Sequence, residues 1–111
     1  MARVPVITCV QNDNNIKIIF NIKKDGIYES LLGATIYFQM TELKSGTVYK
    51  RIAEITDATT AECMYILTSQ DLAIVGTFQT EIQVKYSNGT ILTKRNPVVI
   101  SVVPEVVVGL Q

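Results

Sequence analysis

The stretch Phe78–Tyr86 alternates apolar and polar residues with a period of two, and this pattern constrains the fold more than any other feature of the chain. Its sequence is FQTEIQVKY. Successive side chains of a β-strand point to opposite faces, so Phe78 and Ile82 fall on one face, which we expect to be buried. Asn88-Gly89 follows directly and is typical of a two-residue hairpin turn with positive φ at both positions. We therefore expect a strand, a tight turn and an antiparallel return strand.

Similar strand-like runs occur along the whole chain, separated by turn-forming residues at intervals of roughly 8–12 residues. The run over 47–55 has an impure alternation that is typical of an edge strand, and Pro97 is expected to separate the last two runs. No spacing typical of a βαβ unit occurs, so the pattern predicts an antiparallel β-sandwich with Greek-key topology. The expected strands cover residues 4–10, 15–24, 31–42, 47–55, 62–68, 78–86, 90–95 and 98–103.

One segment departs from the strand pattern. Ser69–Leu72 offers capping residues and one short helical turn, and Gly76 follows before the next strand. A Greek-key sandwich needs a connection that crosses from one sheet to the other, and we expect this turn to make that crossing while Leu72 fills the open end of the core. Gly76 would let the chain change direction without a side-chain clash. The alternative is an ordinary loop.

Length and charge restrict the class of protein. At 111 residues the chain has the size of one domain, which we place at 1–104, with 105–111 as a C-terminal arm or tail. Ten basic residues balance ten acidic ones, whereas nucleic-acid-binding proteins carry a basic excess, so we expect no nucleic-acid partner. No stretch approaches the roughly 20 apolar residues that span a bilayer, so we expect no membrane partner. Pro5 interrupts Val4–Val10, which we interpret as a first strand and not a secretory signal.

The sequence carries no pattern typical of catalysis or cofactor binding. The chain has no histidine, no glycine-rich phosphate loop and no nucleophile motif, so we expect no catalytic residue, no cofactor and no metal site. Cys9 and Cys63 lie in strand-like runs far apart in the sequence. We expect two buried free thiols, with a single disulfide between them as the alternative. Asp71 is best explained as a turn residue whose carboxylate accepts hydrogen bonds from backbone N–H groups.

Five tyrosines raise the question of a carbohydrate site, since aromatic rings stack on sugars. Tyr65 and Tyr86 are in phase with core residues, which predicts packing in the core with the hydroxyl at its rim. Tyr37 and Tyr49 are the two that a sugar-binding site would use if they are exposed. They are also normal cross-strand partners, and the chain has no tryptophan.

The C-terminal segment is strongly β-prone and follows the last strand that the fold needs. It is either a frayed strand end or an arm that adds to the sheet edge of a neighbouring protein. As an arm, its interface residues would be Val106, Val107, Val108 and Leu110, together with the first strand.

The segments LLGATIYFQM (31–40) and AECMYILTSQDLAIVGTFQTEIQVKYSNGT (61–90) resemble the N-terminal immunoglobulin-like domain of phage baseplate upper proteins. The resemblance covers about residues 12–103. It rests on motifs that determine the fold, at Leu32-Gly33, Thr68/Asp71-Leu72, Gly76-x-Phe78-x-x-Glu81 and Asn88-Gly89.

The resemblance implies an immunoglobulin-like sandwich in a non-enzymatic structural protein of a tailed-phage virion, made in the bacterial host cytoplasm. Its partners would be other virion proteins, with a homo-oligomer as a further option, and its place would be the baseplate or tail. A head-decoration or head-fibre protein of the same fold is one alternative. A carbohydrate-binding module for host cell-wall glycans is another. The chain is expected to be either a free-standing domain or a piece of a longer protein.

Overall fold

The computed structural model describes residues 4–105 and is built from strands alone. No helix occurs in that range, which confirms the all-β class. In chain order the strands are β1 (Val6–Val10), β2 (Ile16–Asn21), β3 (Thr35–Glu42), β4 (Val48–Asp57), β5 (Glu62–Leu67), β6 (Gly76–Lys85) and β7 (Ile91–Val103).

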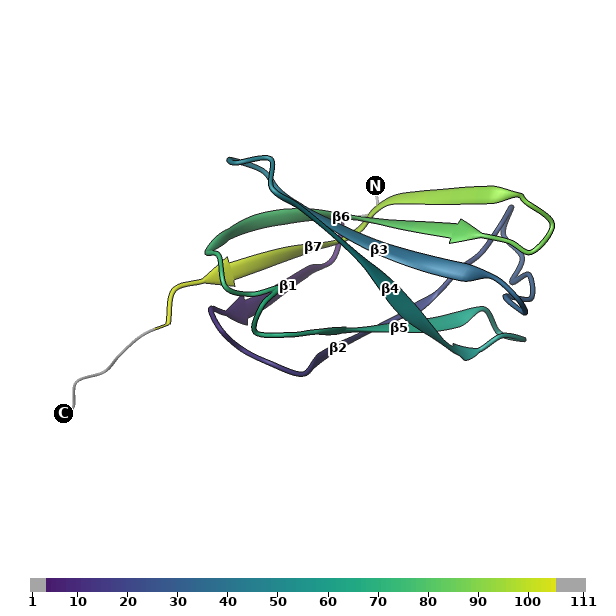
Figure 1. The fold of residues 1–111 in the computed structure, drawn as a ribbon, viewed down its shortest axis with the longest axis horizontal. Coiled ribbons are helices and arrows are strands. Elements are labelled where there is room, and N and C mark those ends of the chain that lie inside the picture. Colours follow the sequence, from purple (N-terminus) through teal and green to yellow (C-terminus); the bar gives the residue numbers. More distant parts are fainter. Residues whose placement is uncertain (1–3, 106–111) are drawn as a thin grey trace.

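The strands form one mixed sheet in the order β1-β7-β6-β3-β4-β5-β2 (Figure 1). The predicted separation into two antiparallel sheets is therefore not shown. Most neighbours are antiparallel, but β1 and β7 run parallel, with Val6 beside Val99 and Val10 beside Val103. A parallel pair needs a long connection between its strands, and here nearly the whole chain provides it.

The sheet curls strongly because β4 changes partner along its length. Its residues 48–53 pair with β3, and the segment from Glu54 to Asp57 pairs with β5 across an irregularity between Ile55 and Asp57. In Figure 1 β4 runs diagonally between the larger part of the sheet and the β5–β2 part. The prediction of an edge strand over 47–55 was wrong. Its impure alternation reflects a strand that serves two differently oriented parts of one sheet.

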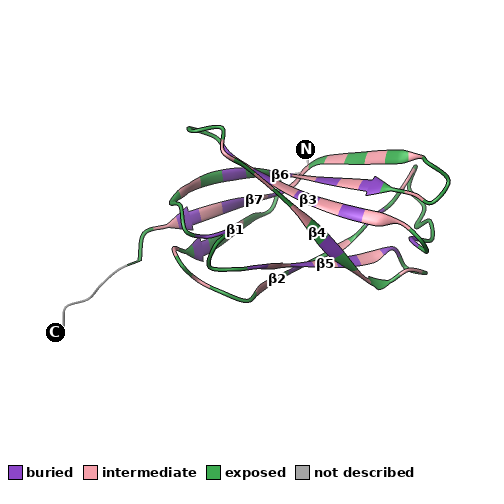
Figure 2. Cartoon of the chain, viewed as in Figure 1, coloured by how far each residue is buried: buried purple, intermediate pink, exposed green. Residues whose placement is uncertain are grey.

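The core lies inside the curl. Side chains on strands that are not neighbours meet there: the ring of Phe38 on β3 stacks on Tyr65 of β5 at 4.9 Å and lies 5.8 Å from Phe20 of β2, measured between centroids. The buried and exposed bands along the strands in Figure 2 follow the period of two. Phe78 and Ile82 are buried, as the alternation in β6 predicted.

The connection between β5 and β6 crosses from one part of the sheet to the other, as expected, but it contains no helix. A single helix-like hydrogen bond, from Leu72 N to Thr68 O at 3.1 Å, is all that forms. Leu72 is fully buried in the core, which confirms its predicted place. Gly76 ends the connection, and a Cβ there would lie 2.9 Å from Oε2 of Glu42. The glycine is therefore needed for close approach.

The hairpin between β6 and β7 is confirmed, with two differences in detail. Tyr86 N donates to Thr90 O, and only Gly89 of the Asn88-Gly89 pair has positive φ, so the loop has three residues and not two. Pro97 does not divide the return strand either. β7 is continuous and absorbs the proline in a bulge, where Thr80 alone faces the residues between Arg95 and Val99.

Candidate interaction site

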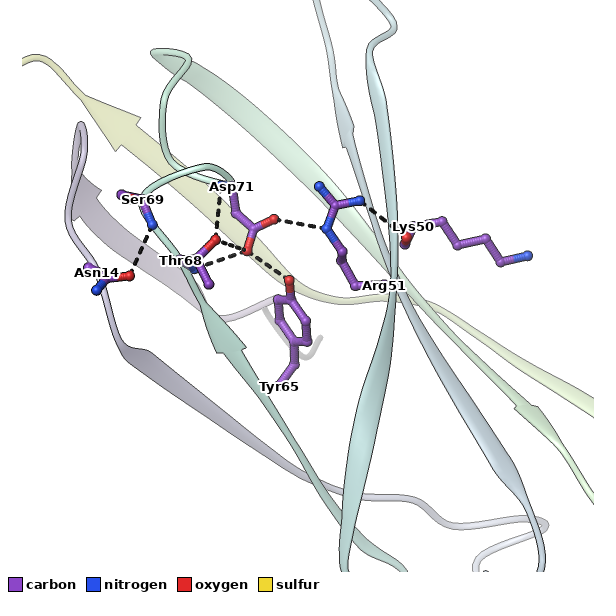
Figure 3. Close-up of polar contacts among 7 residues, drawn as sticks. All are labelled: Asn14, Lys50, Arg51, Tyr65, Thr68, Ser69 and Asp71. Atoms are coloured by element: carbon purple, nitrogen blue, oxygen red, sulfur yellow. Dashed lines mark hydrogen bonds and ion pairs between the residues drawn. The ribbon is translucent and has the colours of Figure 1, made fainter.

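A buried carboxylate holds the connection that closes one end of the curl (Figure 3). Asp71 is fully buried, and its Oδ2 accepts hydrogen bonds from the Tyr65 hydroxyl at 2.7 Å and from Thr68 N at 2.9 Å and Thr68 Oγ1 at 3.1 Å. The predicted role of Asp71 as an acceptor for a backbone N–H is confirmed. Tyr65 packs in the core, as predicted, but its hydroxyl is buried with Asp71 and does not lie at the rim.

The second oxygen of this carboxylate faces a cation. Arg51 Nε lies 3.3 Å from Asp71 Oδ1, an ion-pair distance, but its N–H is not directed along a hydrogen bond, so Oδ1 has no hydrogen-bond partner. Burial, followed by the hydrogen bond to Asp71, raises the pKa of Tyr65 above its ordinary value. The hydroxyl therefore stays protonated and donates. The contacts of Asp71 Oδ2 and the ion pair at Oδ1 all lie within the fold, and this arrangement serves structure.

Among residues 4–105, no strand pairs with the outer edge of β1, the outermost strand of the sheet. Val99 N of β7 donates to Pro5 O at 2.8 Å, so the residues of β1 in phase with Pro5 face β7. Backbone groups alternate in direction along a strand, and the N–H and C=O groups of Val6 and Thr8 therefore point to the open side. Such unpaired groups are a template for another chain.

The side chains of β1 leave that edge unprotected. The sequence of the strand, VITCV, contains no charged residue. Val6 is 61% exposed and Val10 38% exposed. The edge ends at Val10, whose N–H and C=O are both bonded to Asp13, at 3.0 and 2.9 Å. A short, apolar and open edge remains.

Other free edges carry the features that discourage pairing. The strand β2, at the other side of the sheet, exposes Lys17. The first half of β7, which β1 does not cover, contains Lys94, Arg95 and Pro97 and the bulge. Charges, proline and bulges on an edge disfavour a further strand. Unlike these two edges, the strand β1 contains no charged residue, no proline and no bulge.

The remaining predicted site residues are placed differently. Val106, Val107, Val108 and Leu110 lie outside the described residues. Tyr37 and Tyr49 fall on opposite faces of the sheet: Tyr49 packs on the core beside Phe78, with ring centroids 6.1 Å apart, while Tyr37 lies between buried residues of β3 and carries Lys50 Nζ 4.8 Å from its ring centre. The rings of Tyr37 and Tyr49 therefore cannot stack together on one sugar.

Three further findings concern the thiols, metal binding and membrane-spanning helices. Cys9 and Cys63 are free and buried, and burial raises the pKa of the Cys63 thiol to about 11. Within residues 4–105 no group of three or more cysteine, aspartate or glutamate side chains is arranged to bind a metal ion. The same range has no helix with the length and apolar character needed to cross a membrane.

Sequence reasoning missed one feature, a hollow of about 230 Å³ beside the bulge in β7. It is lined by polar side chains from the β6–β7 hairpin and from β3, which is distant from them in the sequence. The Asn96-Pro97 pair was the available signal, because asparagine tolerates positive φ and proline cannot donate to a ladder. It was interpreted as a break between strands.

The chain matches a known protein family. The family model described as the BppU N-terminal domain matches residues 2–107, nearly the whole chain. A search of curated protein sequences found no match. The matched family is that of the phage baseplate upper protein, a structural component of the virion, which implies a non-enzymatic role and other virion proteins as partners.

Proposed function

Because the chain belongs to the family of BppU N-terminal domains, we propose that it is a baseplate or tail module of a tailed-phage virion that assembles with other virion proteins through an open strand edge. The observation that carries this proposal is the free edge of β1, which is uncharged and exposes Val6 and Val10. A strand from a partner gains affinity from backbone hydrogen bonds and specificity from the side chains at alternate positions.

The C-terminal arm is the second half of the proposed interface. Val103, the last residue of β7, pairs with Val10, so β7 ends next to the end of β1. We therefore assign residues 1–104 to the folded module and residues 105–111 to an arm. In that arm Val106, Val107, Val108 and Leu110 provide the apolar side chains. The arm and the edge then contribute to one continuous contact with a neighbouring protein or with another copy.

The edge is tested by a proline that blocks pairing without disturbing the fold. Thr8→Pro removes an N–H that points to the open side, whereas the ladder to β7 uses the alternate residues. We expect this variant to lose at least about tenfold in affinity for its virion partner, in line with the loss of one or two backbone hydrogen bonds. The matched control Thr8→Val keeps the N–H and should bind normally.

The measurement is co-purification with the other structural proteins of the phage, quantified by titration, with thermal unfolding as a check on the fold. Normal assembly by a folded Thr8→Pro variant would refute docking through β1. Deletion of residues 105–111 tests the arm separately. The protein captured also decides between the baseplate or tail role and a head-decoration role, since the latter requires capsid proteins.

A further inference from the structure

The bulge in β7 reshapes the outer face of the sheet. Gln79 pairs with Val99 and Glu81 with Arg95, so Thr80 alone faces three residues of β7. The Thr80 side chain replaces the lost ladder, since its Oγ1 donates to the backbone C=O of Val98 and accepts from its N–H. Asn96, at the start of the bulge, has a φ of 53°, an uncommon conformation for a residue other than glycine. Bulges of this kind often lie at functional sites.

A hollow of about 230 Å³ lies at this point. Along β3 and β6 the residues on either side of Gln39, Thr41, Gln79 and Glu81 are buried, so these four side chains point outward, whereas Thr80 is itself buried. The lining is polar throughout and consists of Gln39, Thr41, Gln79, Thr80, Glu81, Arg95 and Asn96.

Some polar groups in this hollow lack a partner among residues 4–105. Oδ1 of Asn96 is buried and accepts no hydrogen bond. Glu81 and Arg95 are directly opposite each other on β6 and β7, yet no ion pair joins them in the described part of the chain. Buried acceptors are normally satisfied, so Asn96 requires an external donor. The hollow therefore presents acceptors and donors side by side.

We propose that this hollow binds one neutral sugar residue. A hydroxyl group both donates and accepts, so adjacent hydroxyls of a sugar ring can donate to Glu81 and Asn96 Oδ1 and accept from Arg95 and the glutamine amides. The carboxylate disfavours an anion and the guanidinium disfavours a cation, which leaves a neutral ligand. The volume is below the roughly 300–1,000 Å³ of pockets for drug-sized ligands, which suits a single ring.

The test is titration of the full chain, labelled with ¹⁵N, with three probes: methyl α-D-glucopyranoside, methyl β-D-galactopyranoside and N-acetyl-D-glucosamine. We expect at least one probe to bind with a dissociation constant on the order of 1 mM, as suits a ligand of this size. The amide signals that shift should belong to the lining residues, with the Asn96 side-chain amide among them. Inorganic phosphate, as an anionic probe, should cause no comparable shift.

Variants separate specific binding from surface effects. Arg95→Ala and Glu81→Ala should each raise the dissociation constant at least about tenfold, the loss of a hydrogen bond to a charged group. Gln83→Ala changes a polar residue on the same strand as Glu81, one step along the same face and outside the hollow, and should leave binding unchanged. Thermal unfolding confirms that each variant is folded.

Two results would overturn the proposal. The first is the absence of saturable shifts with all three sugars up to about 50 mM, which would mean that water alone fills the hollow and bonds to Asn96. The second is binding that Arg95→Ala and Glu81→Ala leave intact. The proposal rests on the bulge and not on the edge of β1, so either can fail without the other.

Discussion

Replacing Asp71 with alanine should destabilise the domain more than a typical single substitution. The side chain is fully buried and accepts three hydrogen bonds, one of them from the Tyr65 hydroxyl, which is itself in the core. A hydrogen bond to a charged acceptor contributes about 1.5–3 kcal/mol. The bond from Thr68 N to Asp71 corresponds to the contact in a capping box that reaches back to the first residue, and it contributes about 1 kcal/mol.

The ion pair with Arg51 adds little to this sum. The Arg51 side chain is 41% exposed and regains water when its partner is lost, so we assign the pair at most about 1 kcal/mol. The expected loss for Asp71→Ala is therefore about 3 kcal/mol. For a domain of this size that lowers the melting temperature by roughly 12 °C.

Urea and thermal unfolding followed by circular dichroism measure this loss. Tyr65→Phe removes one donor and should cost about 1.5 kcal/mol, while Asp71→Asn keeps an acceptor and should cost less than Asp71→Ala. The double variant Tyr65→Phe/Asp71→Ala should lose about 1 kcal/mol less than the sum of the single losses, because both remove the same bond. Additive losses, or a cost below about 1 kcal/mol for Asp71→Ala, would refute the assigned role of the carboxylate.

Three more predictions follow from contacts elsewhere. Gly76→Ala should cost about 1–3 kcal/mol, because its Cβ would overlap the Glu42 side chain, and the cost should be smaller in a Glu42→Ala background. Hydrogen bonds from the N–H groups of Lys44 and Ser45 lower the pKa of Glu42 below its ordinary value of 4.5. The ionised Glu42 therefore stabilises the folded state above pH 4.5, and this contribution is lost as the pH falls through the lower pKa of the folded protein. The melting-temperature difference between the native protein and Glu42→Gln should shrink accordingly at acid pH. The Cys63 thiol, with a pKa of about 11 against an ordinary 9.0, should react with a thiol reagent at least about a hundredfold more slowly in the folded protein than in urea.

A specific result would contradict each of these three predictions. An unchanged cost of Gly76→Ala without the Glu42 carboxylate would place the clash elsewhere. A melting-temperature difference for Glu42→Gln that does not vary between pH 3 and 7 would contradict the lowered pKa. Rapid modification of Cys63 in the folded protein would show that the core opens readily around this residue.

The sequence allowed the local structure to be predicted better than the pairing. The period of two located β6 and its buried residues, and the spacing between Thr68 and Asp71 correctly predicted a carboxylate that caps its own turn. The predicted helical turn at Ser69–Leu72 does not form, because Ile74, Val75 and Gly76 follow within a few residues and none of them favours a helix. One hydrogen bond then forms where a helix needs several.

Pairing could not be predicted because alternation is the same for every partner. VITCV pairs equally well in either direction, and its parallel contact with β7 depends on how the whole sheet curls. The mixed pattern in β4 has two causes that look alike in sequence, an exposed edge or a change of partner, and here the second applies. The hollow at Asn96 depends on the register between β6 and β7, which a single sequence does not specify.

The parallel contact between β1 and β7 also determines how the domain would carry mechanical load. The chain enters at Val6, beside Val99, and leaves at Val103, beside Val10, so tension on the two flanking segments pulls these neighbours in opposite directions along their length. Their ladder is then strained in shear, and its hydrogen bonds must break together instead of opening one after another. We therefore expect this domain to resist mechanical unfolding when it is pulled at its two ends.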